Sequence, residues 1–156
     1  GVEKPVHWFA NGVDADYFAP GAISPIPSRI DAVFVGAMDY WANVDAVLWF
    51  VSEIWRELRQ SVADATFFVV GSNPDPAVKA LNGRGGITVT GRVDDVRPYV
   101  AAAKIAVAPM RIARGIQNKV LEAMAMAKAV VATPAALEGL DAELGTEALA
   151  CASPAA

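Results

Sequence analysis

Residues 32–36 read Ala-Val-Phe-Val-Gly, a short apolar run that ends at a glycine. Such a run is typical of a β-strand that is buried on both faces of a sheet. The same pattern returns in residues 66–71 and 87–91. Further apolar runs predict two more strands and a final edge strand: residues 104–108, 129–132 and 148–151.

Helical patterns fill the spaces between these runs. Apolar residues recur every three or four positions from Val44 to Leu58, with Asn43 as the expected N-cap. Other helices are expected over residues 75–81, from Asp94 or Asp95 to Ala103 with Pro98 in the first turn, and over residues 118–127. Strands that alternate with helices predict an α/β fold, a doubly wound, mostly parallel, Rossmann-like sheet.

The composition agrees with a globular domain and excludes several classes of protein. Hydrophobic residues make up 54% of the 156 residues and charged residues 19%, which argues against disorder. A net charge of −4 makes nucleic acid a poor partner. Cys151 is the single cysteine and His7 the single histidine, so the sequence predicts neither an internal disulfide nor a Cys/His metal site. No apolar run is long enough to span a bilayer.

Residues 1–30 are rich in turn-forming residues and lack periodicity. We interpret them as a leading segment from an absent N-terminal domain, and residues 31–156 as one nucleotide-sugar-binding domain.

Three glycines follow directly after predicted strands: Gly36, Gly71 and Gly91. In doubly wound sheets ligands bind beyond the carboxyl ends of the strands, where the strand order reverses. The three positions therefore predict a ligand-binding edge, although each glycine could simply end its strand.

Residues 115–133 read Gly-Ile-Gln-Asn-Lys-Val-Leu-Glu-Ala-Met-Ala-Met-Ala-Lys-Ala-Val-Val-Ala-Thr. This segment resembles the signature of glycosyltransferase family 4 (group 1), retaining enzymes of the GT-B fold. The resemblance extends over roughly residues 6–140, and residues 36–46 are most similar to sugar transferases of bacterial exopolysaccharide export systems. It implies that the chain is the C-terminal, donor-binding half of a GT-B enzyme.

The resemblance also implies roles for individual residues. The turn at Gly115 leads into a helix N-terminus, which suits a diphosphate. Glu122 would accept hydrogen bonds from ribose hydroxyls, unless it is a solvated partner of Lys119. Residues 91–93 match the loop that holds the base through backbone groups, and Gly36 matches a glycine near the phosphates. The expected donor-binding residues are Gly36, Gly91, Arg92, Val93, Arg114, Gly115, Ile116, Gln117, Lys119 and Glu122.

The sequence departs from the family pattern at three positions. Arg114 stands where the family has a glutamate that holds the transferred sugar. Ala37 and Ala42 stand where the family usually has the two basic residues that clamp the diphosphate. We hypothesise that Lys119, Arg114 or both supply the missing positive charge.

The expected function is glycosyl transfer from a nucleotide-activated sugar, without metal or other cofactor, by an enzyme that is inactive without its N-terminal domain. Two alternatives remain: a nucleotide-sugar epimerase of the GT-B fold, and a non-catalytic nucleotide-binding or interaction module. Trp55 is expected in the core, whereas Tyr40 and Trp41 are candidates for substrate contact. The resemblance implies a cytoplasmic enzyme, with peripheral association at the inner face of the membrane as an open alternative.

Overall fold

The computed structural model describes residues 11–141, 145 and 148–151. Within them six strands form one sheet in the order β3-β2-β1-β4-β5-β6, and every neighbouring pair is parallel. Each strand lies where the apolar runs predict it. The strands are β1 (Ile30–Val35), β2 (Phe67–Val70), β3 (Ile87–Gly91), β4 (Ala103–Ala108), β5 (Ala129–Ala132) and β6 (Ala148–Ala150).

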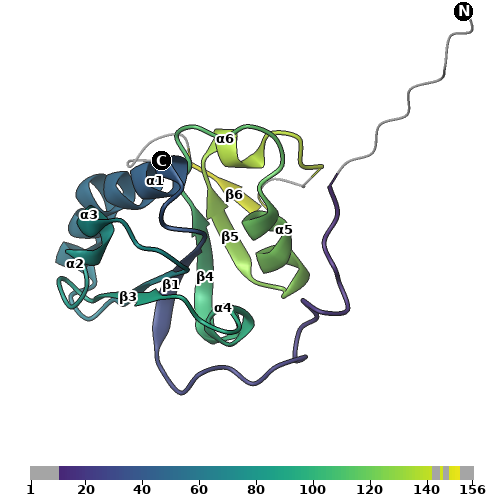
Figure 1. The fold of residues 1–156 in the computed structure, drawn as a ribbon, viewed down its shortest axis with the longest axis horizontal. Coiled ribbons are helices and arrows are strands. Elements are labelled where there is room, and N and C mark those ends of the chain that lie inside the picture. Colours follow the sequence, from purple (N-terminus) through teal and green to yellow (C-terminus); the bar gives the residue numbers. More distant parts are fainter. Residues whose placement is uncertain (1–10, 142–144, 146–147, 152–156) are drawn as a thin grey trace, which may run out of the picture.

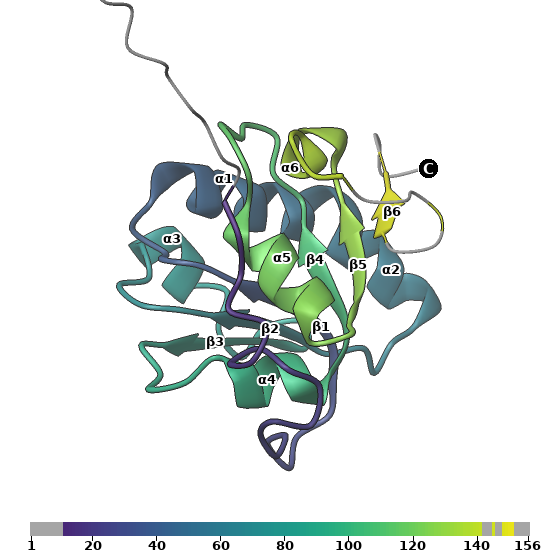
Figure 2. The same cartoon turned by 90° about the vertical axis from the view of Figure 1, so that its right-hand side faces the viewer.

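Helices cover both faces of the sheet. They are α1 (Trp41–Phe50), the π-helical turn η1 (Val51–Trp55), α2 (Arg56–Ser61), α3 (Pro76–Lys79), α4 (Arg97–Ala102), α5 (Asn118–Ala125) and α6 (Pro134–Leu137). Figure 1 shows α1 and α2 on the left of the sheet, and Figure 2 shows α4 and α5 in front of it with α1 and α2 behind. The doubly wound, Rossmann-like fold predicted from the sequence is confirmed.

The predicted N-cap at Asn43 is wrong. Helix α1 begins at Trp41, so Asn43 lies inside its first turn and is 6% exposed. Its side-chain nitrogen donates to the carbonyl of Ala37 at 2.9 Å, and its side-chain oxygen accepts from Nζ of Lys119. The amide is therefore occupied by groups outside the helix and does not cap it.

The other predicted helix starts agree with the structure. The Asp95 carboxylate accepts a hydrogen bond from the amide of Arg97 at 2.9 Å, where α4 begins, and Pro98 lies in the first turn. Asp75 caps α3 by accepting from the amide of Ala77 at 2.8 Å. Pro98 is tolerated because the first turn of a helix has no backbone acceptor for its amide groups.

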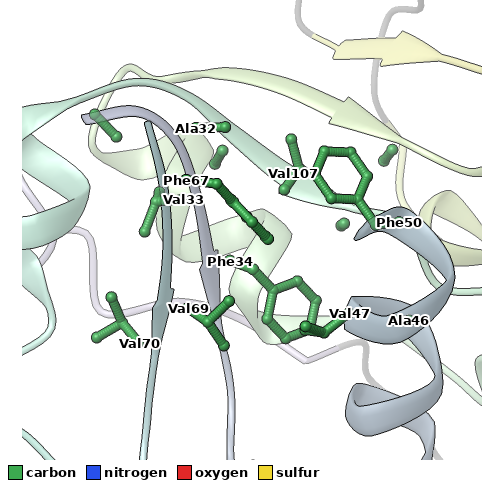
Figure 3. Packing of buried hydrophobic residues seen from close by; sticks show 14 of the residues in the cluster. Ala32, Val33, Phe34, Ala46, Val47, Phe50, Phe67, Val69, Val70 and Val107 are labelled. Atoms are coloured by element: carbon green, nitrogen blue, oxygen red, sulfur yellow. The ribbon is translucent and has the colours of Figure 1, made fainter. Parts of the chain in front are cut away.

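The main core lies between the sheet and α1. Phe34 of β1 lies beside Val47 of α1 (Figure 3), and both side chains are fully buried. Trp55 packs against Phe67 with ring centroids 5.3 Å apart, and its indole N–H donates to the carbonyl of Gly85 at 2.8 Å. The indole nitrogen thus has an acceptor, and the core position predicted for Trp55 is confirmed.

The described part of the leading segment lies against the domain on the α4 side (Figures 1 and 2). The guanidinium of Arg97 lies 3.5 Å from the centroid of the Tyr17 ring and donates to the carbonyl of Tyr17 at 2.9 Å. The amide of Ile26 donates to the carbonyl of Pro98 at 3.2 Å. His7 lies outside the described residues.

None of the helices within residues 11–141, 145 and 148–151 combines the length and the apolar character needed to cross a membrane.

Candidate nucleotide-sugar site

The strand order reverses at β1, which lies between β2 and β4. Gly36 and Gly71 follow β1 and β2 at this point, and the loops that contain them touch closely. Gly71 has φ +151°, and a Cβ there would lie 1.8 Å from the carbonyl oxygen of Gly36. The amide of Met38 also donates to the carbonyl of Ser72 at 2.8 Å. Glycine at position 71 therefore lets the two loops form one continuous rim.

A cleft of about 510 Å³ opens at this rim, a volume within the range of small-molecule sites. It lies at the reversal of strand order, where doubly wound sheets bind their ligands. Its lining residues are Phe18, Val35, Gly36, Ala37, Gly71, Ser72, Asn73, Arg92, Val93, Val96 and Glu122.

Glu122 contributes a half-buried carboxylate to the cleft from the second turn of α5. Burial raises the pKa of Glu122, and the nearby positive charge of Lys119 opposes that shift. No hydrogen bond or ion pair to the Glu122 carboxylate is found within the described ranges, so the predicted alternative of a Lys119–Glu122 ion pair is not seen. The carboxylate is therefore available to accept hydrogen bonds from a ligand.

Arg92 is the cationic residue among those that line the cleft. It follows β3, its side chain is exposed, and it forms no ion pair within the part of the chain that the structure describes. Gly91, immediately before it, has φ +69°, a left-handed conformation that other residues adopt only at a cost.

Some of the expected donor-binding residues line the cleft and others do not. Gly36, Arg92, Val93 and Glu122 line the cleft. Gly91 adjoins it through Arg92. The residues outside its lining are Arg114, Gly115, Ile116, Gln117 and Lys119.

The turn that leads into α5 provides free backbone donors. Gly115 has φ +70°, and the side-chain amide of Gln117 donates to its carbonyl at 3.0 Å. No side chain caps the helix. Within the described residues, the amides of Asn118 and Lys119 have no acceptor, which leaves the helix start suited to an anion.

Lys119 is partly buried between α5 and α1. Its Nζ lies 4.5 Å from the centroid of the Phe34 ring and 3.7 Å from Sδ of Met110, and it donates to the Asn43 side chain. Burial lowers the pKa of Lys119 to about 8, although the charge of Glu122 acts in the opposite direction.

An exposed aromatic pair lies where the loop before α1 meets the helix. Tyr40 is 52% exposed and Trp41 56% exposed. Asp39, in the same loop, accepts a hydrogen bond from the Asn73 side chain at 2.9 Å. Trp49 contacts another element, since the guanidinium of Arg111 lies 5.9 Å from its ring centroid.

Sequence reasoning did not select Phe18, Ser72, Asn73 and Val96 as site residues. Ser72 and Asn73 follow Gly71, which was expected at the ligand edge, so the strand-to-glycine pattern carried a signal for them. Phe18 lies at the cleft because of the path that the leading segment takes. A single sequence contains no physical signal for that path.

The fold of this chain is also found in solved structures of other proteins. A search of curated protein sequences finds no match. Among solved structures, HepE of Anabaena in complex with UDP and glucose is similar with a TM-score of 0.67 and 16% identity, over 92% of this chain and 42% of that one. The C-terminal domain of LpcC from Francisella tularensis, a glycosyl transferase group 1 family protein, gives a TM-score of 0.65 and 19% identity, over 92% and 83% of the two chains.

A glycosyltransferase from Rickettsia africae is similar with a TM-score of 0.63 and 19% identity, over 84% of this chain and 39% of that one. The chain therefore spans about two fifths of the length of HepE and of the Rickettsia enzyme. These likenesses show a shared fold, that of the GT-B glycosyltransferases. A family model described as "Glycosyl transferases group 1" matches residues 29–155, and the chain belongs to this family.

Proposed function

We propose that this chain is the donor-binding domain of a retaining glycosyltransferase that transfers a sugar from a nucleoside diphosphate to an acceptor. The observation that carries the proposal is the carboxylate of Glu122, which has no partner among the described residues and lines a cleft at the reversal of strand order together with Gly36 and Arg92. Membership of the group 1 glycosyl transferases supports the same chemistry.

The lining suggests how a nucleoside diphosphate would bind. Glu122 would accept hydrogen bonds from the ribose hydroxyls, which would satisfy a carboxylate that burial makes costly. Residues 91–93 would hold the base through backbone groups. The diphosphate would lie near Gly36 and the free amides at the start of α5, with its leaving-group charge stabilised by Arg92, Lys119 or Arg114.

The enzyme would need an N-terminal domain for its acceptor and the remaining polar groups, so this chain alone would bind the donor without turnover. We propose no metal or organic cofactor, because side chains and backbone amides would neutralise the diphosphate. Family 4, exopolysaccharide synthesis, and a cytoplasmic location with peripheral contact to the inner membrane face are parts of the same proposal.

Calorimetry with the common nucleoside diphosphates tests it. We expect at least one of them to bind at millimolar or lower concentration, and Glu122→Ala to weaken that binding at least tenfold, since a hydrogen bond to a charged group is worth about 1.5–3 kcal/mol. The exposed Glu57 on α2 provides the matched control, Glu57→Ala.

Other outcomes would favour the alternatives. Failure of every nucleoside diphosphate to bind would overturn the proposal and favour an interaction module. For the full-length protein, an epimerised nucleotide sugar without a glycosylated acceptor would identify an epimerase.

A further inference from the structure

The rim of the cleft is connected to a partly buried lysine, Lys119, behind it. The Ala37 carbonyl accepts from Nδ2 of Asn43 at 2.9 Å, and Oδ1 of Asn43 accepts from Nζ of Lys119. The three groups form a continuous hydrogen-bonded chain from α5, through the first turn of α1, to the loop that lines the cleft.

Gly36 is part of the same arrangement. A Cβ at position 36 would lie 2.7 Å from Nδ2 of Asn43, so the amide fits beneath the loop because residue 36 has no side chain. Asn43 is 6% exposed and is the one buried polar or charged side chain of the described core. A buried side-chain amide of this kind requires partners, and here both of its polar atoms have one.

The loop held by these hydrogen bonds presents a free backbone N–H donor. The amides on either side of Ala37 already have acceptors. The amide of Gly36 donates to the carbonyl of Val70, and the amide of Met38 donates to the carbonyl of Ser72. The amide of Ala37 itself has no acceptor within the ranges that the structure describes. Since Ala37 lines the cleft, this amide is placed to donate to an anion there.

We propose that Lys119 is a positioning residue, which acts through Asn43 to hold the Gly36–Ala37 loop in the geometry that binds the diphosphate. The inference rests on the proposed function. It differs from a direct contact of Lys119 with the phosphates, because the ammonium group acts on Asn43, behind the loop. This role of Lys119 would explain how the protein binds a diphosphate although Ala37 and Ala42 stand where the family usually has two basic residues.

The groups around Lys119 determine which charges act on its ammonium group. The acidic group that acts on it is Glu122, on its own helix. The other elements packed around it present uncharged groups: the Phe34 ring from β1, the Asn43 amide from α1 and the Met110 sulfur from the β4–α5 loop. With its pKa lowered to about 8, the ammonium group loses its proton under mildly alkaline conditions.

A double-mutant cycle tests the chain of contacts. Lys119→Met and Asn43→Ala should each weaken nucleoside diphosphate binding about tenfold at neutral pH, the order expected for a charge-assisted hydrogen bond. The double variant should be no weaker than the weaker single variant. Two outcomes would overturn the inference and indicate a direct phosphate contact. In one, the loss of affinity in the double variant equals the product of the two single losses; in the other, Asn43→Ala binds normally while Lys119→Met binds weakly.

Lys128→Met is the control for the loss of a half-buried lysine. Nζ of Lys128 donates to the carbonyls of Ala101 and Ala103, and it lies outside the lining of the cleft. This variant should bind the nucleotide as the wild type does.

A second measurement requires no ligand. In amide NMR spectra the Ala37 N–H resonance should move in Lys119→Met and stay in Lys128→Met. An unmoved Ala37 resonance would overturn the positioning role, even if no nucleotide binds and the proposed function fails.

The pH dependence of binding by the wild-type protein offers a third test, with two variants as comparisons. The affinity of the wild-type protein for a nucleoside diphosphate should fall as the pH rises through about 8, and the affinity of Lys128→Met should fall in parallel. The affinity of Lys119→Met should not change over this range. A wild-type affinity that does not change over this range would overturn the inference.

Discussion

Glu122 of α5 and Arg92, in the loop after β3, line the same cleft, and no ion pair joins them. The absence of an ion pair, which holds within residues 11–141, 145 and 148–151, leaves an acceptor and a cation exposed to one ligand. A nucleoside diphosphate has a ribose diol that donates and a diphosphate that attracts positive charge. The pair therefore allows the two ends of such a ligand to be tested separately.

Glu122→Gln should weaken binding of the nucleoside and of the nucleoside diphosphate by the same factor, about tenfold or more, because both contain the ribose. Calorimetry with the two ligands measures this. Unchanged binding of the nucleoside would contradict the ribose contact, and tighter binding of the diphosphate alone would place Glu122 against the phosphates, whose negative charge it would repel. Since burial raises the pKa of Glu122, wild-type affinity should also fall as the pH drops through the raised pKa, and Glu122→Gln should lack this fall.

Arg92→Ala should weaken binding of the nucleoside diphosphate and leave binding of the nucleoside unchanged. The expected loss is about threefold to tenfold, because the exposed guanidinium acts through water of high dielectric constant. The loss should shrink in high salt. Arg56→Ala, which removes an exposed arginine of α2, is the control, and an equal loss there would attribute the effect to net charge.

The stability of the fold should rise with pH above about 8 because of Lys119. Its pKa is lowered from 10.5 to about 8 in the folded state, so between these values the unfolded chain binds a proton that the folded chain does not. The free energy of unfolding should therefore increase by about 2 kcal/mol between about pH 8 and pH 9.5, relative to Lys119→Met.

Urea denaturation at several pH values measures this difference. Stability and nucleotide affinity would then change in opposite directions over the same range, so global unfolding would not explain the lost binding. Equal pH dependence of the wild type and Lys119→Met would contradict the prediction.

Gly71→Ala should destabilise the fold by about 3 kcal/mol, since the added Cβ would lie 1.8 Å from the backbone oxygen of Gly36. Gly91→Ala is the matched comparison: its added Cβ has no atom within 4 Å, and it carries mainly the cost of a left-handed backbone, about 1–2 kcal/mol. Chemical denaturation should give a lower free energy of unfolding for Gly71→Ala than for Gly91→Ala. The reverse order would show that the two loops can separate.

The fold was predictable because its central strands, β1 and β2, are buried on both faces. Runs such as residues 32–35 and 67–70 are apolar throughout and end at glycine, and this pattern distinguishes them from amphipathic strands. The start of α1 was not predictable in the same way. Asn43 has the residue type of an N-cap, but a long-range contact with Lys119 determines where its side chain goes.

The cleft was predictable in part for a related reason. Gly36, Arg92 and Glu122 follow from the strand ends and from a recognisable helix segment. Phe18 reaches the cleft through the irregular leading segment, whose path is set by contacts such as that between Arg97 and Tyr17. Local sequence patterns contain no information about contacts of this range.

The position of Phe18 has a practical consequence for protein production. The family match begins at residue 29, and a fragment trimmed to that boundary would keep every strand. It would nevertheless lose an aromatic wall of the cleft and the ring that stacks on Arg97. Weak ligand binding by such a fragment would then reflect the trimming and not the chemistry of the intact pocket.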